Sequence, residues 1–128
     1  MKRARAHSQC MHSCQNGHDL CARALIEAGA EVDKAKDSGF TALMFSCQNG
    51  HELCARAPIE AEAEIDTVTD DGQSMSALFI ASAKGHESCA RLLIEKGADV
   101  NRETTRGDTA LKIAQVQGHA AICALLEA

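Results

Sequence analysis

The chain has 128 residues, of which 45% are hydrophobic and 24% are charged, a balance that excludes a disordered tail. It contains no Trp or Tyr, three Phe and one Pro, against nine Gly and seven Cys, so its core must consist of small side chains. Because β-sheets prefer aromatic and β-branched residues, this composition favours closely packed helices. We therefore expect an all-α fold.

The charge distribution argues against several classes of partner. The formal net charge is −5 although Lys2, Arg3 and Arg5 are basic, so the remainder of the chain is more acidic still. An acidic body with few aromatic side chains disfavours nucleic-acid binding. No apolar run is long enough to span a membrane, and none follows residues 1–7, a basic N-terminal segment, as in a signal peptide. These features predict an intracellular protein in the cytoplasm, with the nucleus as the alternative if the basic start belongs to a localisation signal.

The chain repeats itself with a period of about 33 residues. Gly-His pairs begin at Gly17, Gly50, Gly85 and Gly118, at spacings of 33, 35 and 33. Residues 13–33 and 46–66 are identical at 17 of 21 positions. The sequence therefore predicts about four structural repeats, at about 8–36, 37–69, 70–104 and 105–128, with the first and last incomplete.

Each repeat has the sequence signals of two helices and a loop. The hydroxyl groups of Thr41 and Thr109 are suited to cap helices at roughly 41–49 and 109–117, and the Gly of each Gly-His pair to end a first helix. A second helix follows, as at 86–96, where Cys89, Leu92 and Leu93 form an apolar stripe. Polar linkers at 34–40, 67–75 and 102–108 each contain one Gly and are expected to form hairpin loops. Because two short helices cannot bury an apolar face alone, the repeats must stack.

Three stretches of the chain resemble ankyrin repeats: GFTALMFSCQNGHELCARAPIEAEAEID, SALFIASAKGHESCARLLIEKGADVN and GDTALKIAQVQGHAAICALL. The resemblance covers about residues 8–128. It implies a helix-turn-helix repeat solenoid with hairpin loops that binds another protein, catalyses nothing, and has no cofactor and no small-molecule substrate. This sequence departs from the family motif at its Pro and His positions, which hold Ala42, Ala77, Ala110, Met44, Phe79 and Lys112.

The resemblance also implies where a partner binds, at the hairpin tips and at the exposed ends of the first helices. In the loops these positions are Ala35, Asp37, Ser38, Phe40, Val68, Asp70, Asp71, Gln73, Met75, Glu103, Thr105, Arg106 and Asp108, and on the first helices they are Gln48, Asn49, Ala83, Lys84, Val116 and Gln117. We expect an exposed Phe40 beside acidic Asp70 and Asp71 to suit a partner segment with one apolar anchor and flanking basic residues.

The cysteines and histidines raise two alternatives. One is a metal-binding or thiol-redox protein that uses Cys10, Cys14, Cys21 and their neighbours, and the other is a nucleophile–base pair of His18 with Cys14 or Cys21. The repeats favour a packing role instead, because one column of equivalent positions holds Cys21, Cys54, Cys89 and Ile122. There is no Cys-x-x-Cys pair, phosphate-binding loop, zincin motif or nucleophile elbow. We therefore expect a non-enzymatic protein in which the Gly-His histidines serve their local turns.

Three irregularities interrupt the repeats. Pro58 replaces a Leu inside the second helix of the second repeat, so we expect that helix to kink or stop near Ala57, and Pro58→Leu to raise the melting temperature. Glu62 stands where Gly ends the corresponding helices. Two extra residues at 73–75 lengthen one loop, either as a contact feature or as a neutral insertion. The incomplete end repeats leave it open whether the chain belongs to a longer array, associates through its ends, or is the targeting fragment of a larger multidomain protein.

Overall fold

The structure, a computed structural model, describes residues 12–28 and 39–127. Residues 12–15 are helical, and seven further helices follow in chain order: α2 (Asp19–Glu27), α3 (Ala42–Asn49), α4 (Glu52–Glu60), α5 (Ala77–Lys84), α6 (Glu87–Glu95), α7 (Ala110–Gln117) and α8 (Ala120–Glu127). Within the described residues there is no β-strand, only an isolated antiparallel bridge between Val68 and Ser76. The expectation of an all-α fold of helix-turn-helix repeats is confirmed.

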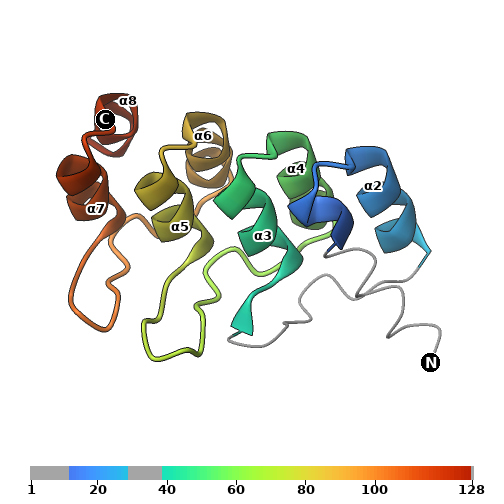
Figure 1. Ribbon diagram of the computed structural model, residues 1–128, viewed down its shortest axis with the longest axis horizontal. Helices are drawn as coiled ribbons and strands as arrows, with labels where there is room; N and C mark the ends of the chain where they lie inside the picture. The colour runs from blue at the N-terminus through green and yellow to red at the C-terminus, as the bar shows by residue number, and fades with distance from the viewer. Residues whose placement is uncertain (1–11, 29–38, 128) are drawn as a thin grey trace.

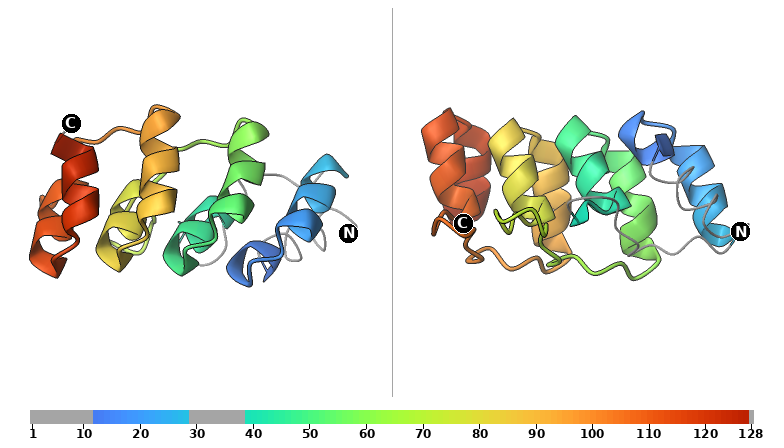
Figure 2. Two further views of the ribbon diagram at one scale, coloured as in Figure 1. Left: turned by 90° about the horizontal axis from the view of Figure 1, so that it is seen from above. Right: turned by 60° about the horizontal axis from the view of Figure 1, so that its bottom comes forward.

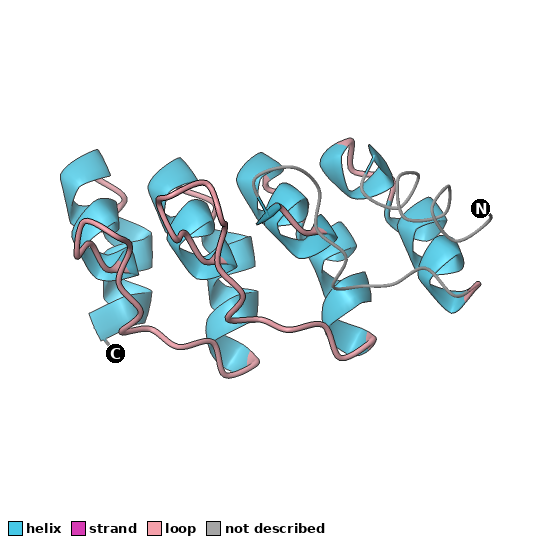
Figure 3. Cartoon of the chain, turned by 90° about the horizontal axis from the view of Figure 1, so that it is seen from below, coloured by secondary structure: helices cyan, strands magenta, loops and turns pink. Residues whose placement is uncertain are grey.

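The helix pairs stand in a row from one end of the molecule to the other (Figure 1). The first helices α3, α5 and α7 contact one another in sequence and form one layer, and the second helices α2, α4, α6 and α8 form the other. Figure 2 shows these two layers from above, and Figure 3 shows the long connecting loops gathered on one side of the stack. The loops at 66–75 and 99–108 therefore project next to each other beside the layer of first helices.

Side-chain caps and left-handed residues fix the ends of the first helices. The hydroxyl oxygens of Thr41, Ser76 and Thr109 accept hydrogen bonds of 3.1–3.3 Å from the backbone N–H groups of Met44, Phe79 and Lys112. Gly50, Gly85 and Gly118 end α3, α5 and α7 with φ of 74°, 80° and 78°. The predicted caps at Thr41 and Thr109 and the predicted glycine ends are thus confirmed, and each second helix begins two residues after its glycine.

Three of the Gly-His histidines, His51, His86 and His119, contact the preceding repeat as well as their own turns. Nε2 of His86 lies 3.0 Å from the carbonyl oxygen of Gln48, and Nε2 of His119 lies 3.2 Å from that of Ala83. Each ring covers the glycine of the preceding repeat, so a Cβ added at Gly85 would lie 2.6 Å from Cε1 of His119. How one repeat stacks on the next decides that a histidine reaches the end of the preceding first helix. This contact between repeats cannot be predicted from the residues of the turn alone.

Small apolar side chains fill the space between the two layers. Leu43, Met44, Leu78, Leu92 and Leu93 are almost completely buried, together with alanines and the thiols of Cys47 and Cys89. This confirms a core of small residues, because short helices in contact along a stack leave little room for aromatic rings.

Helix α4 continues through Pro58 to Glu60, so the expectation that it stops near Ala57 is wrong. It has nine residues, as many as α2 and α6. Proline removes only one helical hydrogen bond here, the one to the carbonyl of Cys54, and that oxygen lies 4.0 Å from the thiol of Cys14. Beyond Pro58 the backbone closes normally, with Ala63 N–H donating to the Pro58 carbonyl at 2.9 Å. Tertiary packing against both neighbouring second helices holds the helix despite its low propensity.

Glu62 takes the left-handed conformation that glycine has in the third repeat. Its φ is 66°, against 90° at Gly97. The N–H of Glu62 donates to the Ile59 carbonyl at 3.0 Å, as that of Gly97 does to Ile94 at 3.1 Å. A side chain in this region costs about 1 kcal/mol relative to glycine, so Pro58 and Glu62 both weaken the second repeat.

Replacing Pro58 by Leu should stabilise the protein. The substitution restores an N–H donor for the Cys54 carbonyl and inserts the residue found in the equivalent buried position Leu93. Since proline inside a helix costs about 3 kcal/mol, we expect the melting temperature, followed by circular dichroism, to rise by about 5 °C or more. The converse change Leu93→Pro should lower it, and an unchanged or lower value for Pro58→Leu would contradict this account.

Gly85→Ala should destabilise the protein more than Gly118→Ala. Both substitutions place a side chain at a similar positive φ, but only Gly85 lies beneath a histidine ring, whereas no atom lies within 4 Å of a Cβ at Gly118. In urea unfolding, the loss should be about 1 kcal/mol at Gly118 and about 1–3 kcal/mol larger at Gly85. In a His119→Ala background the difference between the two sites should vanish, and its persistence would show that the ring is not the cause.

Candidate functional site

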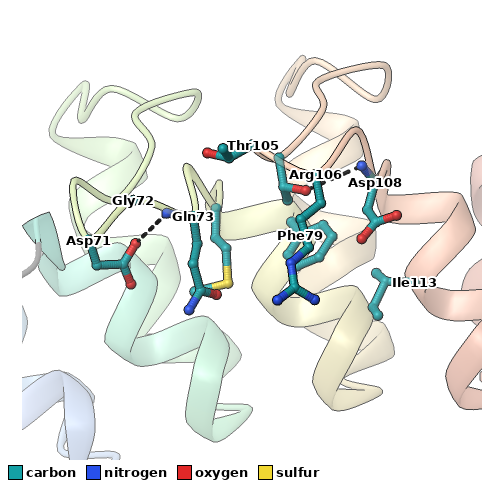
Figure 4. A pocket seen from close by; sticks show the side chains of 10 residues that line it. Asp71, Gly72, Gln73, Phe79, Thr105, Arg106, Asp108 and Ile113 are labelled. Carbon is teal, nitrogen blue, oxygen red and sulfur yellow. Dashed lines mark hydrogen bonds between the residues drawn. The ribbon is translucent and has the colours of Figure 1, made fainter.

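A pocket of about 540 Å³ opens between the two described loops, over helices α5 and α7 (Figure 4). We call it the loop pocket. One wall comes from the loop at 66–75, the other from the loop at 99–108, and the floor from the first turns of the two helices. It is lined by Asp71, Gly72, Gln73, Met75, Phe79, Thr104, Thr105, Arg106, Asp108 and Ile113.

The first wall is held in shape by hydrogen bonds around Thr69. This buried hydroxyl donates to Oδ1 of Asp71 at 2.8 Å and accepts from the N–H of Met75 at 3.0 Å. The same carboxylate oxygen accepts from the N–H of Gln73 at 3.0 Å. The Thr69 hydroxyl and the Gln73 N–H hold the pKa of Asp71 below its ordinary value, so this carboxylate is charged at neutral pH.

The two-residue insertion connects the first wall to the second. The N–H of Thr105 donates to the carbonyl of Gln73 at 3.0 Å, and the hydroxyl of Thr105 lies 3.3 Å from that of Ser74. Ser74 has a positive φ of 55°, a strained conformation for a residue with a side chain. The inserted segment therefore lines the pocket and links the two loops by hydrogen bonds.

The second wall is a tight turn with one unpaired charge at its tip. The N–H of Thr104 donates to the carbonyl of Asp108 at 2.9 Å, and the N–H of Asp108 donates to the hydroxyl of Thr104 at 3.2 Å. Oδ1 of Asp108 lies 3.1 Å from Nζ of Lys112. Among the described residues, Arg106 has neither an ion pair nor a hydrogen bond through its guanidinium group, and its side chain is exposed.

The loop pocket brings together six of the predicted contact residues, namely Asp71, Gln73, Met75, Thr105, Arg106 and Asp108. Asp70 lies instead against Gly39 of the preceding loop, Val68 is half-buried in the bridge to Ser76, and Glu103 is exposed outside the pocket. The predicted residues on α3, α5 and α7 lie at the helix ends remote from the loops: Gln48, Asn49, Ala83, Lys84, Val116 and Gln117. Ala35, Asp37 and Ser38 lie outside the described residues.

Phe40 is not the exposed anchor that the sequence suggested. It is half-buried, packs against the core, and its ring centroid lies 5.2 Å from that of Phe45. The aromatic surface of the site comes from Phe79, which with Ile113 and Thr104 was missed as a contact residue. The sequence could have indicated Phe79 as a contact residue, because it lies in the first helical turn after a loop, and a residue at that position faces the base of the loop.

Most of the described cysteines pack between repeats as small apolar residues. Four are buried, and the thiols of Cys54 and Cys89 lie 3.9 and 4.0 Å from the carbonyl oxygens of Ser13 and Ser46 in the preceding repeats. Burial raises the pKa of Cys54 to about 12, and a hydrogen bond with Cys89, together with burial, raises the pKa of Cys47. Since the thiolate is the reactive and metal-binding form, the raised pKa values disfavour both chemistries at Cys47 and Cys54. The hydrogen bond with Cys47 lowers the pKa of Cys89, which is protected instead by its complete burial.

Of the candidates for a metal or thiol-redox site, Cys10 lies outside the described residues, Cys14 is buried, and Cys21 and His18 are exposed. In the described part of the chain, no group of three His, Cys, Asp or Glu side chains is placed to hold a metal ion. The described thiols thus divide into buried packing residues and the more accessible Cys21 and Cys123.

Thiol labelling should distinguish these two classes. In the native protein at pH 8, we expect a maleimide to modify Cys21 rapidly and Cys123 more slowly, while Cys14, Cys47, Cys54 and Cys89 react only after urea unfolding. Peptide mass spectrometry identifies the labelled residues, and rapid native modification of the buried thiols would refute the packing role.

The burial of Cys54 also predicts a dependence of stability on pH. The pKa of this thiol is about 12 in the folded state, against about 8.5 in an unfolded chain. The contribution of the neutral Cys54 thiol to the free energy of unfolding should therefore be lost as the pH rises from about 9 to about 12.

Comparison with protein families agrees with the arrangement described above. A family model described as ankyrin repeats (3 copies) matches residues 4–69 and 59–128. A comparison with curated proteins finds no match. No helix in the described part of the chain has the length and apolar character needed to cross a membrane. Ankyrin repeats generally mediate protein–protein interactions. With family matches over most of its length and stacked helix pairs joined through Gly-His contacts, the chain belongs to the ankyrin repeat family.

Proposed function

We propose that this chain is a non-catalytic protein-interaction module that binds a partner through its loops and the adjoining layer of first helices. The observation that carries the proposal is the loop pocket, in which six residues at the family's usual contact positions meet around an apolar floor. Concave sites with an apolar floor and a few polar groups are the usual form of a binding site.

The distribution of variation among the repeats supports the same surface. Packing positions are retained from repeat to repeat, as in the column of Cys54 and Cys89, whereas the segments that connect the repeats, 61–76 and 96–109, differ in length and sequence. Rigid scaffolds commonly place binding residues on such loops. An intracellular, cytoplasmic location belongs to the proposal and is supported by the buried free thiols of Cys47, Cys54 and Cys89, which are suited to a reducing compartment.

Quantitative affinity purification with two charge-reversal variants tests the proposed surface. Lys84→Glu combined with Glu103→Lys alters the proposed surface, and Glu95→Lys combined with Lys96→Glu alters the end of α6 in the other layer. All four side chains are exposed, and both variants keep the net charge of −5. We expect partners of the wild-type chain to be depleted about tenfold or more by the first variant and retained by the second, because a reversed charge at an interface is repulsive.

Each partner should then be produced alone and its affinity measured for the three forms. Equal affinity of all forms, or loss only with the α6 variant, would contradict the proposed surface. Circular dichroism of both variants excludes unfolding as the reason for a loss.

A further inference from the structure

The floor of the loop pocket is apolar. Phe79 is 8% exposed, and Met75 and Ile113 are half-buried, so all three offer apolar atoms to the space between the loops. Figure 4 shows Phe79 and Ile113 below the loops and Arg106 extending past the Phe79 ring. Both the volume and the lining suit one apolar side chain of a partner together with its neighbouring residues.

The charged side chains around this floor differ in whether they already have a hydrogen-bond or ion-pair partner. Asp71 already accepts hydrogen bonds from Thr69 and Gln73, and Asp108 is paired with Lys112. Arg106 is the one charged residue lining the pocket for which the structure gives no partner within the described residues. A guanidinium group presents several N–H donors in a fixed plane that matches the two oxygens of a carboxylate.

Both walls are ordered before any partner arrives. Hydrogen bonds from Thr105 join the loops, and the N–H of Asp99 donates to Oδ1 of Asp66 at 2.8 Å, which ties the base of one loop to the other. Pre-organised loops lower the entropy that binding must overcome. The loop pocket therefore combines an exposed arginine, an apolar floor and two linked loops, which together suit a segment with an apolar side chain and a carboxylate.

We propose that the loop pocket binds an extended segment of a partner protein in which an apolar side chain enters over Phe79 and Ile113 and a neighbouring Asp or Glu pairs with Arg106. This inference rests on the proposed function and gives the chemistry of its partner. It also replaces the basic partner expected from Asp70 and Asp71, because Asp71 is engaged within its own loop and Asp70 lies against Gly39.

Selection from a random library of linear 12-residue peptides displayed on phage tests the proposal with the whole 128-residue chain. Peptides enriched by the wild-type chain should share an apolar residue with Asp or Glu within two positions. Selection on Arg106→Glu should instead enrich Lys or Arg beside the apolar residue. Arg102→Glu is the matched control, since Arg102 is an exposed arginine of the same loop outside the pocket, and it should select the wild-type sequences.

The second readout is the affinity of one enriched peptide for the wild-type chain and for each variant, measured by fluorescence anisotropy. Arg106→Glu and Arg106→Gln should each weaken binding about tenfold or more, because a charge-assisted pair is lost, while Arg102→Glu should leave it within about twofold. Ile113→Ala should weaken binding without changing the preference for an acidic neighbour. Thermal unfolding of each variant checks that the chain remains folded.

Enriched peptides that lack the acidic residue, or whose affinity is unchanged by both Arg106→Glu and Ile113→Ala, would overturn this inference while leaving the proposed function intact. If the wild-type chain enriches no peptide and also retains no protein partner in the affinity purification, both fail together.

Discussion

The structure depends on the contact between each repeat and the one before it. Helices of eight or nine residues are too short to be stable alone, so each pair must bury its apolar face against its neighbours. The Gly-His pairs set the distance of that contact, since the His86 and His119 rings lie over Gly50 and Gly85 and reach the ends of the preceding first helices. Glycine is required there for two reasons, a positive φ and the space that the next ring occupies.

The fixed distance between repeats also accounts for the small residues of the core. At two successive interfaces a thiol reaches a carbonyl oxygen of the preceding repeat, from Cys54 to Ser13 and from Cys89 to Ser46. At the third interface Ile122 occupies the position of Cys89, and Ser82 occupies that of Cys47. The hydroxyl of Ser82 is buried and has no hydrogen-bond partner among the described residues. Because such a group costs about 1–3 kcal/mol, the replacement of a thiol by a hydroxyl at this position weakens the third interface.

Features encoded within a few residues could be predicted from the sequence, whereas features that depend on spatial neighbours could not. The capping threonines and terminal glycines act on backbone groups three or four residues away, and the sequence placed them correctly. The persistence of α4 through Pro58 depends on neighbouring helices that outweigh local propensity. The loop pocket needs Thr105 to meet Gln73 across two loops, and no periodicity in the sequence reports that distance. Phe40 and Phe79 illustrate the same limit, since both follow loops but only Phe79 lines the pocket.

The stacked helices provide stability and the loops provide the proposed binding surface, but the two roles are connected at the second repeat. The insertion at 73–75 leaves α3, α5 and α7 in contact, so its extra length is taken up entirely by the loop. Because the loop takes up the extra residues, its sequence and length can change, and with them the residues that contact a partner, while the helices stay packed. The loop nevertheless begins just after Pro58 and Glu62, the two destabilising residues of α4 and its end, and Asp66 anchors it to the following loop. Local opening of the second repeat would therefore release one wall of the pocket, and binding of a segment between the loops would stabilise the repeat that Pro58 and Glu62 weaken.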